Sequence, residues 1–137
     1  MILVSACLIG EKCKYNGGDN YSEKLMEFLK GKEYVAICPE VLGGLPTPRT
    51  SCEIIRGRVI DQNGVDKTME YEKGAEQALK IALEKGCKLA ILQTRSPSCG
   101  KGKIYDGTFS KRLIVGDGKT VQLLEKNGIE VINIENL

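Results

Sequence analysis

Four short apolar segments, separated by helix-like segments, constrain the fold of this chain more than any other feature of its sequence. They cover residues 2–7, 34–38, 88–93 and 130–134. The first, ILVSAC, is a continuous apolar run without polar alternation, which is typical of a strand buried on both faces of a parallel sheet. We predict a strand at each of the four segments, with the second also buried and stopped by Pro39.

The segments between these strands predict helices. Residues 69–85 carry apolar side chains at the spacing of an amphipathic helix, and Ser22 and Thr120 are positioned to cap two shorter helices that end near residues 30 and 126. Strands that alternate with helices imply right-handed crossovers. The predicted fold class is therefore α/β, a Rossmann-like layer structure with a mainly parallel sheet flanked by helices.

The remaining segments are rich in turn residues. Residues 41–51 hold two glycines and two prolines and predict no regular element, and residues 95–118 read as one long glycine-rich loop. Residues 54–60 predict a short ribbon. With 137 residues and no linker, we expect a single domain over 1–137.

The absence of histidine narrows the possible chemistry. It excludes Ser-His-Asp triads, Cys–His nucleophile pairs and histidine-ligated metals. The net charge of +2, from 20 basic and 18 acidic residues, argues against a protein that grips a phosphate backbone. No apolar run is long enough to span a bilayer and the N-terminus lacks a basic leader, so the cytoplasm is the expected location.

Three of the six cysteines follow predicted strands. Cys7 and Cys38 stand at the carboxyl ends of the first two, and Cys99 lies in the loop that leaves the third. The carboxyl ends of parallel strands meet at one edge of the sheet, where ligands bind. We therefore expect these thiols to converge and to bind an iron–sulfur cluster.

The number and spacing of the cysteines indicate which metal centre they can hold. A structural zinc site needs four ligands, usually in paired C-x-x-C motifs, and none occurs here. Iron–sulfur clusters are normally held by four cysteines, so three would leave one iron open to act as a Lewis acid. Cys13 is a possible extra ligand that would close the site. Cys52 and Cys87 read as small buried hydrophobic residues.

Several polar residues lie beside these cysteines. Glu40 follows Cys38 and Pro39 and is the predicted proton donor or acceptor, since a carboxyl group must do this work without histidine. Ser96 and Ser98 precede Cys99 and are candidates to hydrogen-bond a substrate. Arg49, and also Arg95, are candidates to bind an anion or a carbonyl group.

Five sequence blocks resemble one known family. They are residues 4–10 (VSACLIG), 14–18 (KYNGG), 38–49 (CPEVLGGLPTPR), 95–100 (RSPSCG) and 104–109 (IYDGTF). Together they are similar to the thiouracil desulfidase (TudS) family over essentially the whole chain. The sequence departs from the family pattern at Gln93, where a lysine is expected, and at Cys52, where a small residue is expected.

The resemblance implies a 4Fe-4S cluster on three cysteines, which by position are Cys7, Cys38 and Cys99. It implies non-redox removal of sulfur from a thiolated pyrimidine, giving uracil and hydrosulfide, with Ser96 and Glu40 as catalytic residues. Longer relatives carry an extra domain and act on tRNA, so a free base or nucleoside is expected here rather than nucleic acid. The cluster-assembly machinery is an implied partner.

Three other functions stay open at the level of sequence. A non-catalytic iron–sulfur carrier predicts a fourth ligand, most plausibly Cys13. A metal-free redox or sulfur-transfer enzyme predicts activity without iron, with Cys99 as nucleophile. A structural zinc module predicts a colourless protein with stoichiometric zinc.

Overall fold

A four-stranded parallel sheet forms the centre of the protein. A computed structural model describes residues 1–137, and its sheet consists of β1 (Ile2–Ser5), β2 (Tyr34–Ile37), β5 (Leu89–Leu92) and β8 (Glu130–Asn133). The strand order is β2-β1-β5-β8, and every neighbouring pair is parallel. The predicted α/β fold with a Rossmann-like layer structure is confirmed.

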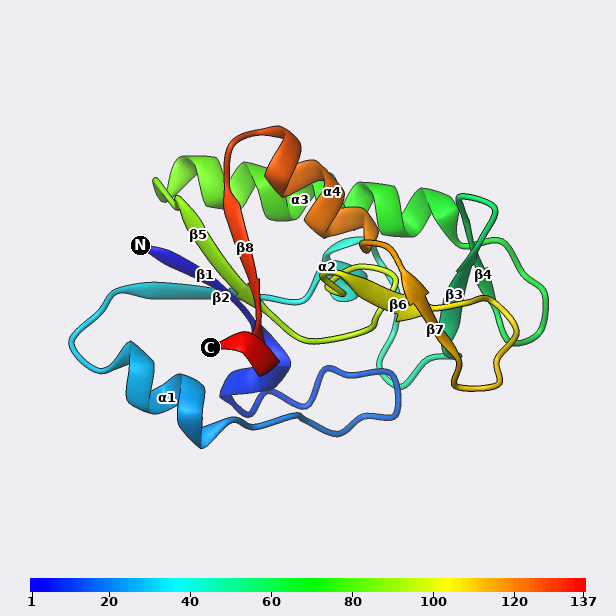
Figure 1. Cartoon of the computed structure of the whole chain (residues 1–137), viewed down its shortest axis with the longest axis horizontal. Helices are drawn as coiled ribbons and strands as arrows, with labels where there is room; N and C mark the ends of the chain where they lie inside the picture. The colour runs from blue at the N-terminus through cyan, green and yellow to red at the C-terminus, as the bar shows by residue number, and fades with distance from the viewer.

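Helices cover both faces of the sheet, giving three layers (Figure 1). One face packs against α3 (Thr68–Glu84) and α4 (Lys119–Lys126). The other packs against α1 (Glu23–Leu29) and the 3₁₀ turn η1 (Ala6–Ile9), with the C-terminal turn η2 (Ile134–Asn136) beside them. As predicted, Ser22 caps α1, because its hydroxyl oxygen accepts a hydrogen bond from the Leu25 amide at 3.1 Å.

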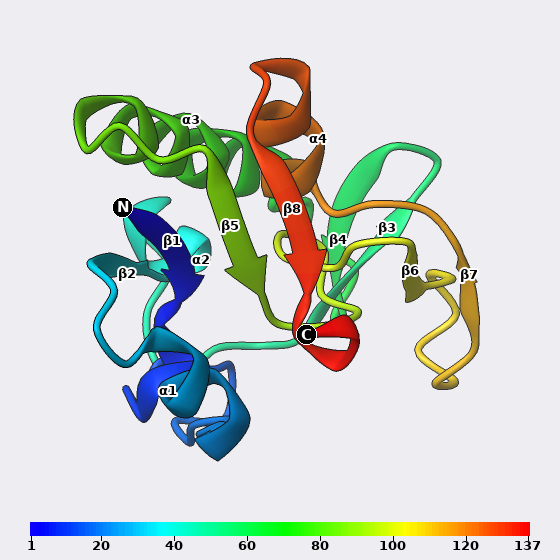
Figure 2. The same ribbon diagram turned by 60° about the vertical axis from the view of Figure 1, so that its left-hand side comes forward.

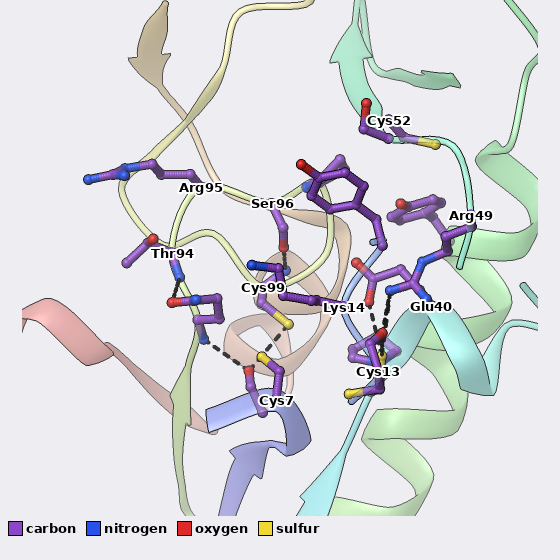
Figure 3. Close-up of a pocket in the computed structure, with 18 of the residues that line it drawn as sticks. Cys7, Cys13, Lys14, Glu40, Arg49, Cys52, Thr94, Arg95, Ser96 and Cys99 are labelled. Atoms are coloured by element: carbon purple, nitrogen blue, oxygen red, sulfur yellow. Dashed lines mark hydrogen bonds between the residues drawn. The ribbon is translucent and has the colours of Figure 1, made fainter. Parts of the chain in front are cut away.

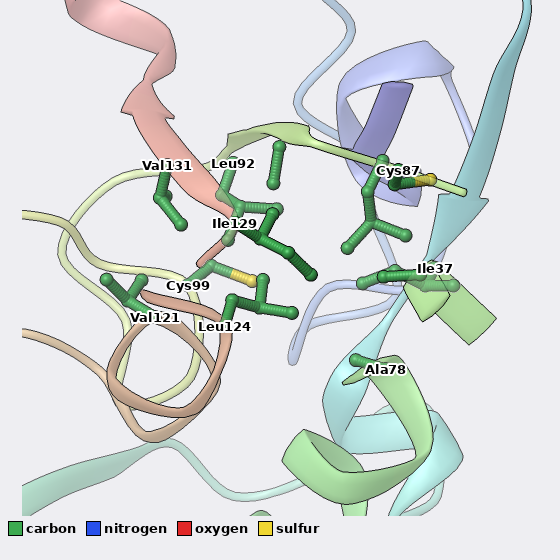
Figure 4. Packing of buried hydrophobic residues seen from close by; sticks show 12 residues of the cluster. Ile37, Ala78, Cys87, Leu92, Cys99, Val121, Leu124, Ile129 and Val131 are labelled. Carbon is green, nitrogen blue, oxygen red and sulfur yellow. The ribbon is translucent and has the colours of Figure 1, made fainter. Parts of the chain in front are cut away.

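Successive residues of the central strands point to opposite faces, so both faces need apolar side chains. Leu3 and Leu92 pack toward α3 and α4, whereas Val4 and Ile91 pack toward α1, and all four are fully buried. Figure 4 shows the α3–α4 side, where Leu124 contributes to the same cluster as Leu92. This two-sided burial explains why these strands lack alternation in the sequence. None of the helices is long and apolar enough to cross a membrane.

Two strand predictions are corrected. The first strand ends at Ser5, because the chain turns into η1 there, and Cys7 therefore lies in a 3₁₀ turn rather than on the strand. The strand over residues 34–38 is not buried throughout. It forms the edge of the sheet, and Tyr34 at its start is exposed.

Two antiparallel hairpins lie side by side beyond the end of the sheet (Figures 1 and 2). Strands β3 (Cys52–Ile55) and β4 (Arg58–Asp61) form the predicted ribbon. Strands β6 (Lys103–Tyr105) and β7 (Leu113–Val115) form a second hairpin inside residues 95–118, so the prediction of one long loop is wrong. Each strand has only three residues, which is too short for a periodic pattern to stand out among glycines.

The start of the last helix is also corrected. Gly118 occupies the capping position of α4, and Thr120 lies inside the helix rather than capping it. Its hydroxyl group is buried and has no hydrogen-bond partner. A threonine before an apolar run predicts a cap from local chemistry alone, whereas the packing of α4 on the loop around Ser98 set the actual start.

A short helix, α2 (Pro39–Leu42), occupies the start of the stretch for which no regular element was predicted. It packs against α3 with almost no space between the two backbones. A Cβ atom on Gly74 of α3 would lie 2.0 Å from the carbonyl oxygen of Pro39, and one on Gly43 would lie 2.0 Å from that of Glu70. Both positions therefore require glycine, and this contact fixes where Glu40 lies.

Replacing Gly74 by alanine is expected to lower the free energy of unfolding by about 3 kcal/mol, the upper end for overpacking, because a backbone carbonyl cannot move aside like a side chain. Urea unfolding of the purified protein measures the change. The control is Glu76→Ala at an exposed position of the same helix, which should stay within about 0.5 kcal/mol of the parent. Equal stability of the two variants would contradict the close approach of α2 and α3.

Candidate functional site

The main cavity lies at the carboxyl ends of the parallel strands. The chain leaves β1 toward β2 on one side, whereas β5 and β8 lie on the other, so the strand order reverses between β1 and β5. Ligands in open parallel sheets bind at this switch point. A cavity of about 530 Å³ opens here, and Ser5, Ile37 and Gln93 at the strand ends contribute to its lining. Its volume lies within the ~300–1,000 Å³ typical of small-molecule sites.

Cys7, Cys38 and Cys99 all line this cavity, as expected from their positions after three strands. Cys7 comes from η1, Cys38 stands at the capping position of α2, and Cys99 comes from the loop after β5. Figure 3 shows the sulfur atoms of Cys7 and Cys99 directed toward one another. Segments far apart in the sequence therefore bring three thiols to one pocket.

The thiols of Cys7 and Cys99 lie in low-dielectric surroundings. Burial raises the pKa of the Cys7 thiol, and the nearby Cys38 and Glu40 side chains add to the rise. Burial likewise raises the pKa of Cys99, with Glu40 as the next cause. The hydroxyl groups of Ser5 and Ser98 each lie 3.5 Å from the Cys99 sulfur, and a hydrogen bond donated by Ser5 favours the thiolate. Both thiols thus need a positively charged partner to ionise easily.

Cys38 differs because its thiol interacts with that of Cys13. The hydrogen bond from Cys13 lowers the pKa of Cys38, although burial opposes the change. The same contact is the main reason that the pKa of Cys13 is raised. Arg49 donates to the Cys13 carbonyl oxygen at 2.8 Å and lies 3.9 Å from the Cys38 sulfur. Cys38 is therefore the thiol of the three that is closest to a stable thiolate.

The donor chemistry of the pocket fits a soft, multinuclear metal centre. Thiolates favour zinc, copper(I) and iron–sulfur clusters over hard cations. No three of the Cys, Asp and Glu side chains are gathered closely enough to hold a single metal ion. A cluster of several irons places its thiolates on different metals and so holds them farther apart. Three cysteines around an open cavity suit such a cluster.

A chain of hydrogen bonds connects Cys99 with Glu40. The Cys99 amide donates to the Ser96 hydroxyl oxygen at 2.8 Å, and the hydroxyls of Ser96 and Ser98 are 3.2 Å apart. Ser98 donates to Glu40 Oε1 at 2.5 Å. Because a hydroxyl has one hydrogen, Ser96 is then the donor to Ser98. Glu40 is buried and its Oε2 lies 3.6 Å from the Cys38 sulfur, which brings a carboxylate next to one of the three thiols.

The two predicted substrate contacts, Ser98 and Arg49, differ in where their side chains lie. Ser98 is fully buried and does not line the cavity, so it supports Glu40 from behind instead of facing a substrate. Arg49 does line the cavity, but its guanidinium also bonds Pro46, Thr47 and Cys13 and so ties two loops together. Sequence shows neither arrangement, because both depend on segments distant in the chain.

The other candidate residues divide into those that line the cavity and one, Cys87, that does not. Cys13 and Cys52 line the cavity, although Cys52 lies well apart from Cys7 and Cys99 (Figure 3). Cys87 is buried in the core, as predicted. Arg95 lines the cavity and its guanidinium is 3.4 Å from Glu135 in an exposed ion pair, which contributes little to stability.

Sequence reasoning missed two residues of the pocket wall. Tyr71 reads as part of the apolar face of α3, yet it lines the cavity, and burial strongly raises the pKa of its phenol, which therefore stays neutral. Glu53 follows Cys52 in the sequence, where no motif marks it as part of a site. It is buried, lines the cavity and bonds the loop between β6 and β7. The only signal for this loop was the block at residues 104–109.

The fold and the pocket define a Rossmann-like α/β protein with a thiol-lined site at the switch point of its sheet. Comparison with known families names the class further. A family model described as 2-thiouracil desulfurase matches residues 2–136. The chain belongs to the 2-thiouracil desulfurase family, and the family resemblance inferred from the sequence blocks is confirmed.

Two relatives extend over nearly the whole chain. The uncharacterized protein YbbK of Bacillus subtilis (strain 168) is 43% identical over 147 residues, covering 100% of this chain and 97% of its own length. A solved structure of the 4Fe-4S-dependent thiouracil desulfidase TudS is 42% identical and superimposes with a TM-score of 0.93, covering 99% of this chain and 91% of that one. The likeness thus extends to the fold as a whole.

Proposed function

We propose that this protein is an iron–sulfur-dependent enzyme that removes sulfur from a thiolated pyrimidine. In the reaction, the C=S group of thiouracil or thiouridine becomes C=O, water supplies the oxygen, and the sulfur leaves as hydrosulfide without net electron transfer. Its class is hydrolase-type C–S cleavage. The observation that carries the proposal is the convergence of three thiols and a buried carboxylate on one cavity.

We assign Cys7, Cys38 and Cys99 as the residues that hold a 4Fe-4S cluster. The family match and the similarity to the 4Fe-4S-dependent TudS support the cofactor, and the soft donor set of the pocket is consistent with it. A cluster with three protein thiolates supplies a Lewis-acidic iron that polarises a thiocarbonyl group. The protein contributes the positions of the thiolates and the groups around them.

Glu40 is the group that we assign to proton transfer. Its Oε1 accepts a hydrogen bond from the Ser98 hydroxyl, which fixes the carboxylate, and its Oε2 lies beside the Cys38 sulfur. In this position it can take a proton from an attacking water and return it to the departing sulfur. Ser96 lines the cavity and is held by the Cys99 amide, so we assign it to hold the pyrimidine ring. Arg49 is proposed to bind a substrate carbonyl.

Anaerobic reconstitution tests the proposal as a whole. The protein is loaded with iron and sulfide, the bound metal and sulfide are measured per chain, and the absorption spectrum is recorded. The loaded protein is then given 2-thiouracil, and uracil and hydrosulfide are quantified. We expect both products in equal amounts and none from the metal-free protein. Equal activity without iron would favour a metal-free thiol enzyme and overturn the scheme.

Replacing Cys13 by alanine is expected to leave the iron content unchanged, because Cys7, Cys38 and Cys99 supply the protein ligands in the scheme. Iron and sulfide analysis measures this, with Cys7→Ala as the matched variant that should lose the cluster. Loss of iron in the Cys13 variant would make Cys13 a fourth ligand and favour a carrier without catalysis.

The remaining expectations are also proposals. We propose that residues 1–137 act as a single iron–sulfur-binding desulfidase-type domain in the cytoplasm. We further propose that the substrate is a small molecule rather than nucleic acid, and that the cluster-assembly machinery loads the protein. The net charge of +2 supports the proposal on nucleic acid.

A further inference from the structure

The loop between β6 and β7 forms one wall of the cavity. Tyr105 at the end of β6, and Phe109 and Lys111 within the loop, all line it. These residues come from the hairpin that lies beside the β3–β4 ribbon, away from the parallel sheet (Figure 2). The position of this wall therefore depends on contacts between the two hairpins.

The backbone of this loop is held in an unfavourable conformation. Phe109 has φ +56° and Lys111 has φ +65°, in the left-handed region that residues with a side chain rarely adopt. Such conformations persist where surrounding contacts enforce them, and they cluster at ligand sites. Some specific contact must therefore hold the loop in place.

Glu53 on β3 supplies that contact. Its Oε1 accepts a hydrogen bond from the Gly107 amide at 3.0 Å and a second from the Phe109 amide at 3.1 Å. The side chain is buried with 8% of its surface exposed, and no lysine or arginine forms an ion pair with it. A buried carboxylate without a cation depends on such amide donors. The two amides and Glu53 thus stabilise one another.

A second contact presses the same loop against β3. Gly107 has φ +93°, and a Cβ atom there would lie 2.6 Å from Ile55 Cγ1 and 3.0 Å from the Ile54 carbonyl oxygen. The loop can approach β3 this closely only with glycine at position 107. The approach brings the Gly107 and Phe109 amides within reach of Glu53.

We infer that Glu53 is a positioning residue, which holds the loop of residues 106–112 as the substrate-facing wall of the cavity. It acts through Phe109 and Lys111, while Glu40 and the cysteines act on the reacting atoms. That the wall contacts a thiolated pyrimidine rests on the proposed function. That Glu53 fixes the loop rests on the structure alone, so the two parts can fail separately.

Tryptophan fluorescence tests the fixing of the loop without any measurement of activity. The chain has no tryptophan, so Phe109→Trp places a single fluorophore in the loop. Adding Glu53→Ala should shift its emission to the red and raise its acrylamide quenching constant at least about twofold, because local opening exposes the ring. Adding Glu53→Gln should change neither, since the amide oxygen can still accept both backbone N–H groups.

A second perturbation changes the loop itself and leaves the Glu53 side chain in place. Gly107→Ala leaves Glu53 intact but prevents the close approach to β3, so it should reproduce the fluorescence change of Glu53→Ala. The matched control is Glu130→Ala, which removes an exposed carboxylate from β8 and should change nothing. Thermal unfolding of each variant shows whether the rest of the protein stays folded.

Steady-state kinetics test whether the loop contacts the substrate. They use the cluster-loaded enzyme without the Phe109→Trp substitution. Glu53→Ala should raise KM for 2-thiouracil about tenfold with kcat lowered less than about threefold, the pattern of lost substrate binding. Glu53→Gln should restore KM. If Glu53→Gln is as impaired as Glu53→Ala while its loop stays in place, the charge itself is needed and the positioning role is overturned. Unchanged fluorescence in both Glu53→Ala and Gly107→Ala also overturns it.

Discussion

A Cys38→Ala protein is expected to fold but to bind no iron–sulfur cluster, and to desulfurate 2-thiouracil more than ~100-fold more slowly than the parent. Removing a residue that only contacts a metal ligand typically costs about 10–100-fold, so the loss expected for a ligand itself is larger. Cys38 stands between β2 and α2, and its thiol is the one whose pKa is lowered. Its removal leaves the thiols of Cys7 and Cys99, and burial raises the pKa of both. Iron and sulfide content, absorption and hydrosulfide release measure the effect.

The control is a cysteine that lies outside the pocket. Cys87 is 2% exposed in the core that packs β5 against α3, so Cys87→Ala should keep its iron while losing a little stability. Comparing Cys38→Ala with Cys87→Ala shows whether iron is lost because a ligand is removed or because any cysteine is replaced. A Cys38→Ala protein with the parent's iron content would remove Cys38 from the ligand set.

Glu40→Gln is expected to lower kcat by about 10²–10³-fold, the size of a lost acid–base group, with no change in iron content. Glutamine has nearly the same shape, and its oxygen can still accept the Ser98 hydroxyl, but its amide cannot take up a proton. Steady-state kinetics of the loaded enzyme, with iron analysis of the same sample, separate proton transfer from cluster binding.

The matched control is Glu130→Gln, an isosteric change at an exposed position on β8 that should leave kcat as in the parent. A second comparison is Ser98→Ala, which removes the bond that fixes Glu40 but keeps the carboxylate. It should lower kcat less than Glu40→Gln does. A Glu40→Gln enzyme with the parent's kcat would show that another group transfers the proton.

Local sequence was sufficient where an element is decided by its own side chains. The apolar runs of β1 and β5 show no alternation because each strand is covered on both faces, and the amphipathic pattern of residues 68–84 marks the side of α3 that faces the sheet. Ser22 caps α1 through a contact only three residues away. Such features need no knowledge of the rest of the fold.

Prediction failed where distant contacts decide. Thr120 has the chemistry of a cap, but the backbone of the Ser98 loop bonds the first amides of α4 and sets its start at Lys119. The β6–β7 hairpin is specified by its neighbour, since Glu53 of β3 holds its loop. Neither contact leaves a periodic signal in the sequence.

The candidate site divides in the same way. The convergence of Cys7, Cys38 and Cys99 on one cavity could be predicted, because each follows a strand and parallel strands end at a common edge. The role of Ser98 behind Glu40 could not, because the two residues are 58 positions apart and meet only when α2 is held against α3.

The sequence by itself determined the kind of fold, the edge of the sheet that holds the site and the thiols that gather there, because the alternation of strands and helices along the chain follows from local patterns. Only the tertiary structure decided which side chains face the cavity and which stand behind them. The physical reason is that burial, hydrogen-bond partners and close backbone approaches are set between segments far apart in the chain, and their energies exist only once those segments meet.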